Sequence, residues 1–220
     1  HHMAGFADAT RRRRGALMDG EEGAALVRSA EEGMRAQKVK NPEQLAYCAI
    51  QDARYSWFHY SEYLALRDSG LAFSDVMAQS MHSRMTLVRG GSAWHVWAIY
   101  VSANYFSLLG VAPVQGRGFL PEEERQGGAP VVVLSYRCWQ RLGGDPKLVG
   151  ESLNVNGAEC QVVGVAPEGF AGMTLDGFDF WLPLGSLRTV DKSYRSRPDR
   201  EPWFYVVGRL KPGLDMAVAQ

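Results

Sequence analysis

Apolar side chains recur at helical spacing in two segments near the start of the chain. Leu26, Ala30 and Met34 lie four residues apart in an otherwise polar stretch, which predicts one weakly amphipathic helix. Residues 58–67 carry a broader apolar stripe, and Gly70 provides a plausible helix end. We therefore expect a weak helix first and a second helix that belongs to a packed domain.

Alternating apolar and polar residues predict a β-hairpin in the middle of the chain. Its strands are residues 85–88 and 94–101, and Gly90-Gly91-Ser92 forms the turn. Apolar side chains occupy both alternating sets of positions in the second strand. Both faces of that strand are therefore expected to be partly covered.

A second hairpin has the clearest turn signal in the sequence. Residues 152–155 alternate, Asn156-Gly157 turns the chain, and residues 160–165 return. Asn-Gly favours a type I′ turn because both central residues need a positive φ. Further strands are expected at residues 131–134, 180–182 and 203–210.

Two serines and a proline mark expected helix starts. Ser102 is expected to cap a helix at residues 103–109, and Ser135 to cap the helix that follows it. Pro121 precedes three glutamates, which we interpret as the acidic first turn of a solvated helix: Glu122, Glu123 and Glu124. Residues 186–201 are expected to form a charged loop, and residues 214–220 the opening of a helix.

Composition and charge exclude several classes of protein. The chain has 220 residues, 46% of them hydrophobic, and its 24 basic residues balance 24 acidic ones. This neutrality argues against a nucleic-acid groove, and the hydrophobic content argues against wholesale disorder. No apolar run approaches the roughly 18 residues that span a bilayer.

The N-terminal residues are expected to lie outside the packed domain. Residues 1–3 resemble the remnant of an affinity tag joined to a start codon, and residues 4–40 are expected to form a polar arm or linker. Within that arm, residues 11–14 are a basic run that we interpret as solvated.

The signatures of catalysis and cofactor binding are largely missing. The sequence contains no phosphate-binding GxxxxGK[ST], no GxSxG and no HExxH, and Gly116-Arg117-Gly118 lacks the third glycine of a dinucleotide fingerprint. The pair His59 and Glu62, and the pair His82 and His95, are more typical of packing than of metal ligation. We therefore predict no catalytic residue, cofactor or metal site.

Cysteines and tryptophans leave alternatives open. Cys48, Cys138 and Cys160 show no zinc-ligand spacing and fit buried apolar positions, with a Cys138–Cys160 disulfide as the alternative in an oxidising compartment. Trp139, Trp181 and Trp203 fall on elements that need a core. The remaining tryptophans are candidates for a contact surface: Trp57, Trp94 and Trp97.

A series of short motifs follows in a fixed order along residues 41–220. They are Asn41-Pro42-Glu43-Gln44-Leu45, Tyr105-Phe106-Ser107-Leu108-Leu109-Gly110-Val111, Gly116-Arg117-Gly118-Phe119-Leu120-Pro121-Glu122-Glu123, residues 131–136 with Trp139, Gly144-Asp145-Pro146, Val149-Gly150, Asn156-Gly157, residues 162–167 and Val207-Gly208-Arg209-Leu210-Lys211-Pro212-Gly213. This series resembles the MacB-like periplasmic core domain of ABC-transporter permeases, in particular the duplicated orphan permeases of soil bacteria. The motifs are turns, caps and strand cores, so no functional site carries over residue by residue.

The resemblance implies an α+β fold with mixed sheets, short helices and two lobes. Residues from about 70 to 185 would form the distal lobe. Residues 41–69 and 186–220 would form the membrane-proximal lobe, truncated at its C-terminal end.

Two departures from the family pattern stand out. His59-Tyr60-Ser61 replaces a Ser-Tyr-Pro-type helix start, and charged residues such as Glu31 stand where a membrane helix usually precedes the domain. Either that helix was left out of this fragment, or the chain is a diverged soluble relative.

The resemblance also implies a function. The leading hypothesis is a non-catalytic, extracytoplasmic (periplasmic) domain of a membrane-anchored ABC-type permease. A cytoplasmic ATPase would drive its movement through the transmembrane part, for envelope transport or mechanotransmission, with an envelope protein or lipoprotein as a further partner. The alternatives are a soluble extracytoplasmic module that binds a peptide or carbohydrate through exposed aromatic residues, and a hydrolase with a scattered site.

Overall fold

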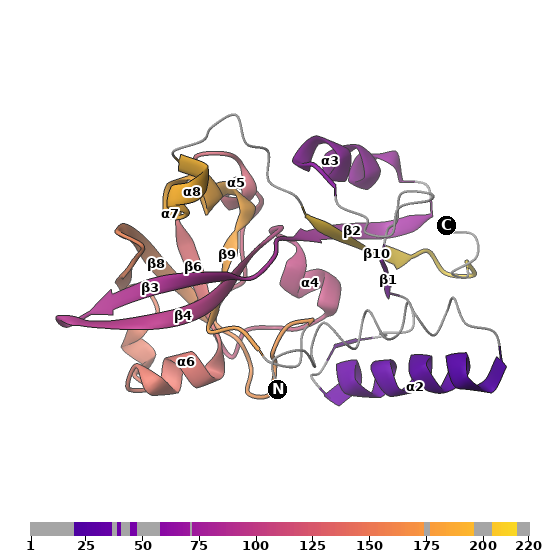
Figure 1. The fold of residues 1–220 in the computed structure, drawn as a ribbon, viewed down its shortest axis with the longest axis horizontal. Coiled ribbons are helices and arrows are strands. Elements are labelled where there is room, and N and C mark those ends of the chain that lie inside the picture. Colours follow the sequence, from indigo (N-terminus) through magenta and orange to yellow (C-terminus); the bar gives the residue numbers. More distant parts are fainter. Residues whose placement is uncertain are drawn as a thin grey trace.

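The computed structural model describes residues 20–36, 39–40, 45–47, 58–70, 72–173, 177–195 and 204–214. These residues form one mixed sheet of ten strands with short helices around it. Figure 1 shows that the strands are divided between two lobes. The α+β class with mixed sheets that the sequence predicted is confirmed.

The larger lobe is a closed ring of six strands, which we call the barrel lobe. In spatial order they are β4 (Ser92–Val101), β3 (Ser83–Arg89), β7 (Ser152–Val155), β8 (Ala158–Val165), β6 (Val131–Leu134) and β9 (Phe180–Pro183). The ring closes because β9 also pairs with β4 in parallel, while β6 and β8 form a second parallel pair. Closure leaves no free edge among these strands. A short strand, β5 (Gln115–Gly116), pairs with β8 outside the ring.

Alternate residues of the six strands pack together inside the ring. Each strand contributes every second side chain to one cluster: Met85, Leu87, Val96, Ala98, Tyr100, Val132, Leu134, Leu153, Val155, Cys160, Val162, Phe180 and Leu182. This spacing follows from the period of two in a β-strand, and it fixes the register of the ring.

The smaller lobe contains three strands between two helices, and we call it the three-stranded lobe. The strands are β1 (Leu45–Tyr47), β10 (Tyr205–Leu210) and β2 (Phe73–Gln79), in that order and all antiparallel. Helix α3 (Tyr60–Ser69) lies on one side of them and α2 (Gly20–Ala36) on the other (Figure 1). The expected helix in the polar N-terminal segment is thus present, with Ala30 and Met34 buried.

Short helices connect and cover the strands. They are α4 (Tyr105–Leu109), α5 (Pro121–Glu124), α6 (Tyr136–Arg141), the 3₁₀ turns η2 (Pro146–Leu148) and η3 (Leu184–Ser186), α7 (Leu187–Val190) and α8 (Lys192–Arg195). The predicted cap at Ser135 is confirmed, because its hydroxyl accepts the Cys138 N–H at 3.1 Å. No helix among the described residues is both long and apolar enough to span a membrane.

Several predicted elements are corrected. Ser102 does not cap α4, which begins at Tyr105, because its hydroxyl bonds to the neighbouring strand β2 instead. The expected loop after residue 185 contains α7 and α8, since Leu187 and Val190 are buried against the core. Glu123 and Glu124 are buried and not solvated, because each has cationic or N–H partners.

Other predictions lie outside the described residues. These are the tag remnant 1–3, the basic run 11–14, the motif at 41–44, Cys48, Trp57, Trp203 and the helix at 215–220. The division into distal and membrane-proximal lobes at about residues 70 and 185 stays a prediction.

The Asn156-Gly157 turn gives a direct test of the barrel hairpin. Asn156 and Gly157 have φ of 52° and 87°, and a Cβ at residue 157 would meet no atom within 4 Å. Gly157→Val should therefore lower the free energy of unfolding by more than about 1 kcal/mol through backbone strain alone. Ser152→Val, on the exposed start of β7, should leave it nearly unchanged. Equal melting temperatures for both variants would contradict the turn assignment.

Candidate functional site

Few backbone hydrogen bonds join the strands of the two lobes. β2 pairs with β4 at one residue pair, Gln79 with Val101, although each strand is extensively paired within its own lobe. Two flanking backbone bonds, from Ser80 N to Tyr100 O and from Ser102 N to Ala78 O, extend this contact slightly. We call residues 78–80 and 100–104 the lobe junction.

Where the backbone pairing between the lobes ends, two serine hydroxyls accept the next backbone N–H groups. Ser102 Oγ accepts the Ala78 N–H at 3.0 Å and donates to Asn104 Oδ1 at 2.7 Å. Ser80 Oγ accepts the Tyr100 N–H at 2.9 Å. The backbone donors are therefore satisfied without a longer strand pairing, which keeps the connection narrow.

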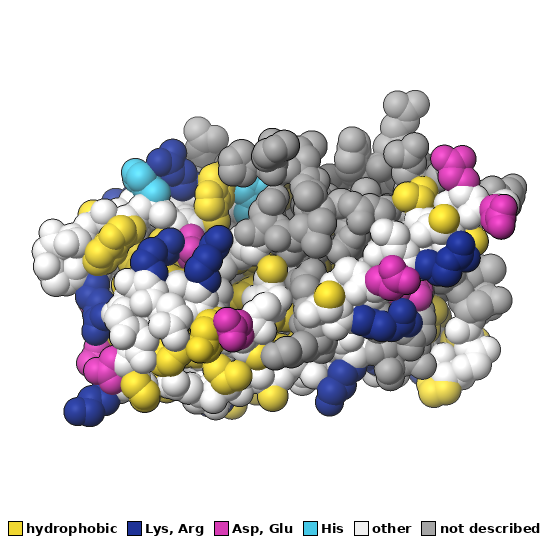
Figure 2. All heavy atoms as spheres, turned by 90° about the horizontal axis from the view of Figure 1, so that it is seen from below, with side chains coloured by type: hydrophobic (Ala, Val, Ile, Leu, Met, Phe, Trp, Pro, Cys, Tyr) yellow, Lys and Arg dark blue, Asp and Glu magenta, His cyan; other side chains and the backbone are white. Residues whose placement is uncertain are grey.

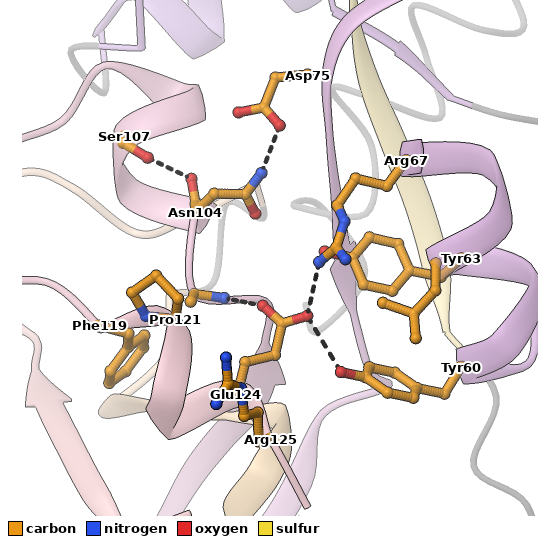
Figure 3. Close-up of a pocket in the computed structure, with 12 residues that line it drawn as sticks. Tyr60, Tyr63, Arg67, Asp75, Asn104, Ser107, Phe119, Pro121, Glu124 and Arg125 are labelled. Carbon is orange, nitrogen blue, oxygen red and sulfur yellow. Dashed lines mark hydrogen bonds and ion pairs between the residues drawn. The ribbon is translucent and has the colours of Figure 1, made fainter. Parts of the chain in front are cut away.

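A cleft of about 580 Å³ lies beside the junction, between the two lobes (Figure 3). Helix α3 supplies one wall, and α4, α5 and the residues before them supply the other. The labelled lining residues are Tyr60, Tyr63, Arg67, Asp75, Asn104, Ser107, Phe119, Pro121, Glu124 and Arg125. We call this hollow the interlobe cleft.

Glu124 is the centre of the cleft. Its carboxylate accepts the Ala103 N–H at 2.7 Å and the Tyr60 hydroxyl at 3.4 Å. Arg67 Nη1 lies 3.6 Å from the same carboxylate. A buried carboxylate is stable only with such donors around it. Because Tyr60 and Arg67 belong to α3, Glu124 ties the three-stranded lobe to the barrel lobe.

The two tyrosines of α3 surround the arginine. The Arg67 guanidinium lies 5.6 Å from the centre of the Tyr63 ring, within cation–π range. Burial, and then the negative charge of Glu124, raise the pKa of both Tyr60 and Tyr63. Both phenols therefore stay protonated, and the Tyr60 hydroxyl is available as a donor to Glu124.

Asn104 forms a second polar tie between the lobes. Its Nδ2 donates to Asp75 Oδ1 at 2.8 Å and to Val76 O at 2.9 Å, both on β2. Asn104 directly precedes α4, and at the other end of that helix the carbonyl of Leu108 accepts from Arg209 of β10. Both ends of α4 are therefore held by the three-stranded lobe.

The glutamate next to Glu124 sets its position. Glu123 accepts two bonds from the Arg117 guanidinium, at 2.7 and 3.0 Å, and the Leu120 N–H at 2.7 Å. The bond from Leu120 N–H to Glu123 closes the first turn of α5. The next residue, Glu124, then has its carboxylate toward α3. The acidic turn seen in the sequence thus contains two buried glutamates, and each has different hydrogen-bond partners.

The predicted tryptophan surface is partly described. Trp94 and Trp97 lie on opposite sides of β4: Trp94 packs against the barrel interior, whereas Trp97 is 46% exposed on the outer wall. A contact role for either stays a prediction, and Trp57 lies outside the described residues. The expected core positions of Trp139 and Trp181 are confirmed.

The histidine pairs weighed in the sequence have structural partners. The Glu62 carboxylate accepts the His59 N–H at 2.7 Å and thereby caps α3. His82 and His95 do not face each other, because β4 places Thr86 opposite His95, and the His82 ring packs on Trp97 at 5.2 Å. No three His, Cys, Asp or Glu side chains converge as metal ligands in the described part of the chain.

Cys138 and Cys160 are free, buried thiols, so the disulfide alternative is not what the structure contains. Burial raises the pKa of Cys138 to about 11 and that of Cys160 to about 12. Such thiols are protonated and poorly reactive.

Comparison with known proteins identifies a family and solved structures of similar fold. The sequence model of one family, described as the MacB-like periplasmic core domain, matches residues 23–220. The periplasmic region of MacB from Actinobacillus actinomycetemcomitans is 14% identical with a TM-score of 0.60, and the match covers 83% of this chain and 84% of that one. The extracellular domain of the noncanonic ABC-type transporter YknZ from Gram-positive bacteria is 16% identical with a TM-score of 0.55, over 77% and 83%. No curated protein matches the sequence.

Removing the central carboxylate should weaken the junction. Glu124→Ala leaves the Ala103 N–H and the Arg67 guanidinium without their acceptor, so we expect the free energy of unfolding to fall by about 2–4 kcal/mol in urea titrations. Glu122→Ala removes an exposed glutamate from the same helix and should change it by less than about 0.5 kcal/mol. Similar values for the two variants would contradict the role of Glu124.

Alkaline pH should destabilise the protein through its buried tyrosines. Their pKa values are raised in the folded state, so above about pH 10 the unfolded chain loses protons first and the free energy of unfolding falls. Tyr63→Phe should make this fall less steep, while Tyr100, Tyr105 and the two buried thiols still contribute in both proteins. An unchanged slope between pH 9 and 11, measured by urea unfolding, would show that Tyr63 is not held protonated as described.

Proposed function

The chain belongs to the MacB-like periplasmic core domain family, and we propose that it transmits movement between the membrane and the envelope through its lobe junction. It is the extracytoplasmic domain of a MacB-like ABC-type transporter permease. In the proposal, a cytoplasmic ATPase supplies the energy through the transmembrane part of the permease. The domain itself carries no catalysis.

One observation carries the proposal: beside the apolar clusters that both lobes share, the strands of the two lobes are joined at a single residue pair and by a few polar ties. The ring of six strands and the helix-covered sheet each have their own network of backbone bonds. The polar connection between them is the pair Gln79–Val101 with its two flanking backbone bonds, together with the bonds of Glu124, Asn104 and Arg209. Motion between packed units concentrates where few bonds hold them.

Open space on both sides of the Glu124 tie supports this view. The interlobe cleft of about 580 Å³ lies on one side. A second hollow of about 250 Å³, lined by Tyr60, Glu124, Gly185 and Phe204 among others, lies on the other. Water can enter both hollows when the tie lengthens, and hydration of the separated ions then offsets part of their lost attraction.

A displacement of α3 also has a route into the barrel. Helix α5 packs on η3, and a Cβ at Gly185 would lie 2.2 Å from the carbonyl oxygen of Arg125. The turn η3 continues directly from β9, which pairs with β4 and β6. A displacement of Glu124 would therefore reach the ring through the close backbone contact between α5 and η3.

The test measures the distance between lobes in the membrane-embedded permease with its ATPase. Spin labels on Glu32→Cys of α2 and Glu159→Cys of β8 report on the two lobes, because both residues are exposed. Cys48→Ser removes one native thiol, and the buried Cys138 and Cys160 stay unlabelled. We expect the distance distribution to change when a non-hydrolysed ATP analogue is added.

Variants of the tie provide the control. Glu124→Ala should broaden the distribution without nucleotide, because the tie that holds one arrangement is lost, and Glu122→Ala should not. An identical, narrow distribution in every nucleotide state, in both variants, would contradict the proposal.

A further inference from the structure

The outer wall of the barrel lobe carries a cationic surface around an exposed tryptophan. Arg84 of β3 is the direct cross-strand partner of Trp97 on β4, and the His82 ring packs edge-on against that tryptophan. His95 is exposed two residues before Trp97 on the same strand. Figure 2 shows basic, histidine and apolar side chains together on the face of this lobe that contains α6.

Two more arginines extend the surface along α6. Asp179, which directly precedes β9, is buried, and its carboxylate accepts the backbone N–H of Trp97 at 2.8 Å. Arg141 lies 3.0 Å from this carboxylate and Arg137 lies 3.7 Å from it. The side chains of Arg141 and Arg137 remain 40% and 68% exposed.

The charges of this surface do not balance. One buried carboxylate, Asp179, faces both Arg137 and Arg141, and Arg84 has no acidic partner among the described residues. Positive charge is therefore in excess although the whole chain is neutral. Arginine donors that are held in place but not saturated are suited to bind carboxylates from outside.

A groove of about 430 Å³ adjoins the arginines. Its lining includes Phe170 and Phe178, which are buried, and Arg137 and Gln140, which are exposed; Glu168 contributes one carboxylate to the lining. A floor of aromatic rings beside an arginine provides an apolar anchor site next to a carboxylate-binding group. Interfaces concentrate binding energy at such combinations of Arg and Trp or other aromatic residues.

We propose that this surface, defined by Arg84, Trp97, Arg137, Arg141 and the adjoining groove, binds an acidic segment of a partner protein that also carries an aromatic or aliphatic side chain. Charge complementarity selects an acidic partner, and the concave groove beside Trp97 selects a protein segment over a flat lipid surface. The surface also lacks the lysine-rich cluster typical of binding to anionic membranes. The inference rests on the proposed envelope setting but not on movement between the lobes.

The probe is a synthetic twelve-residue peptide, (Glu-Phe-Glu)₄, with a fluorescent label, and binding is followed by anisotropy on the 220-residue chain. We expect saturable binding that weakens at least fivefold between 50 and about 300 mM salt, because surface charges are screened. The matching (Lys-Phe-Lys)₄ peptide should not bind.

Charge reversal locates the site. Arg84→Glu with Arg137→Glu should weaken binding about tenfold or more, and Arg141 is kept so that Asp179 retains its partner. Arg28→Glu with Lys211→Glu makes the same change of net charge in the three-stranded lobe and should leave the affinity within about twofold. Trp97→Ala should weaken binding without a change of charge.

Three results would overturn the inference: no salt-dependent binding, equal loss in both double variants, or no effect of Trp97→Ala in a variant that melts like the parent protein. Vesicles of phosphatidylcholine with phosphatidylglycerol test the other source of negative charge. Stronger retention on these vesicles than on the peptide, with the same dependence on Arg84 and Arg137, would assign the surface to lipid and overturn the protein partner. None of these outcomes depends on the lobe distances that test the proposed function.

Discussion

The buried carboxylate of Glu124 is the interaction on which the arrangement of the two lobes depends. It is placed by α5, whose first turn is closed by Glu123 and Arg117, and it receives donors from both lobes. Elsewhere each lobe pairs its own strands, while two apolar clusters each contain side chains of both lobes. Within this contact, the polar tie sets how α3 lies against α5, and it does so with few bonds.

The strands of the ring and the strands at the lobe junction differ in how completely they are paired. A closed ring of strands has no edge to fray, and a displacement at one strand is shared with its neighbours. At the junction, by contrast, the backbone bonding consists of one residue pair, two flanking backbone bonds and two serine hydroxyls. A junction with few backbone bonds is typical of hinge regions in other domains. It supports the proposal that the domain transmits movement in a permease of its family.

The sequence predicted the local elements well where local physics determines them. The Asn156-Gly157 turn, the Ser135 cap and the apolar strand 131–134 each depend on neighbouring residues alone. The order of glycine turns and strand cores also identified the family, although the family match begins at residue 23 and not at 41. Closure of the ring was beyond such reasoning, because the β4–β9 pairing joins residues about eighty positions apart.

The site was misread for a related reason. Three consecutive glutamates after a proline are typical of a solvated helix start, and only the tertiary structure brings Arg67 and Tyr60 to one of them. Ser102 was assigned to its own helix because sequence spacing favours that partner, whereas the Ala78 N–H competes for the same oxygen. One signal was available: Arg117 stands six residues before Glu123, close enough to neutralise an acidic turn.

Amide hydrogen exchange at the junction tests the central claim most directly. It would be measured in the membrane-embedded permease, with and without a bound ATP analogue, comparing residues 78–80 and 101–104 with the ring strand β6. The account predicts weaker protection of the Ala78 and Ala103 amides than of Val132 and Val133, with a change at the junction alone when nucleotide binds. Equal protection of junction and ring, unaffected by nucleotide, would contradict it.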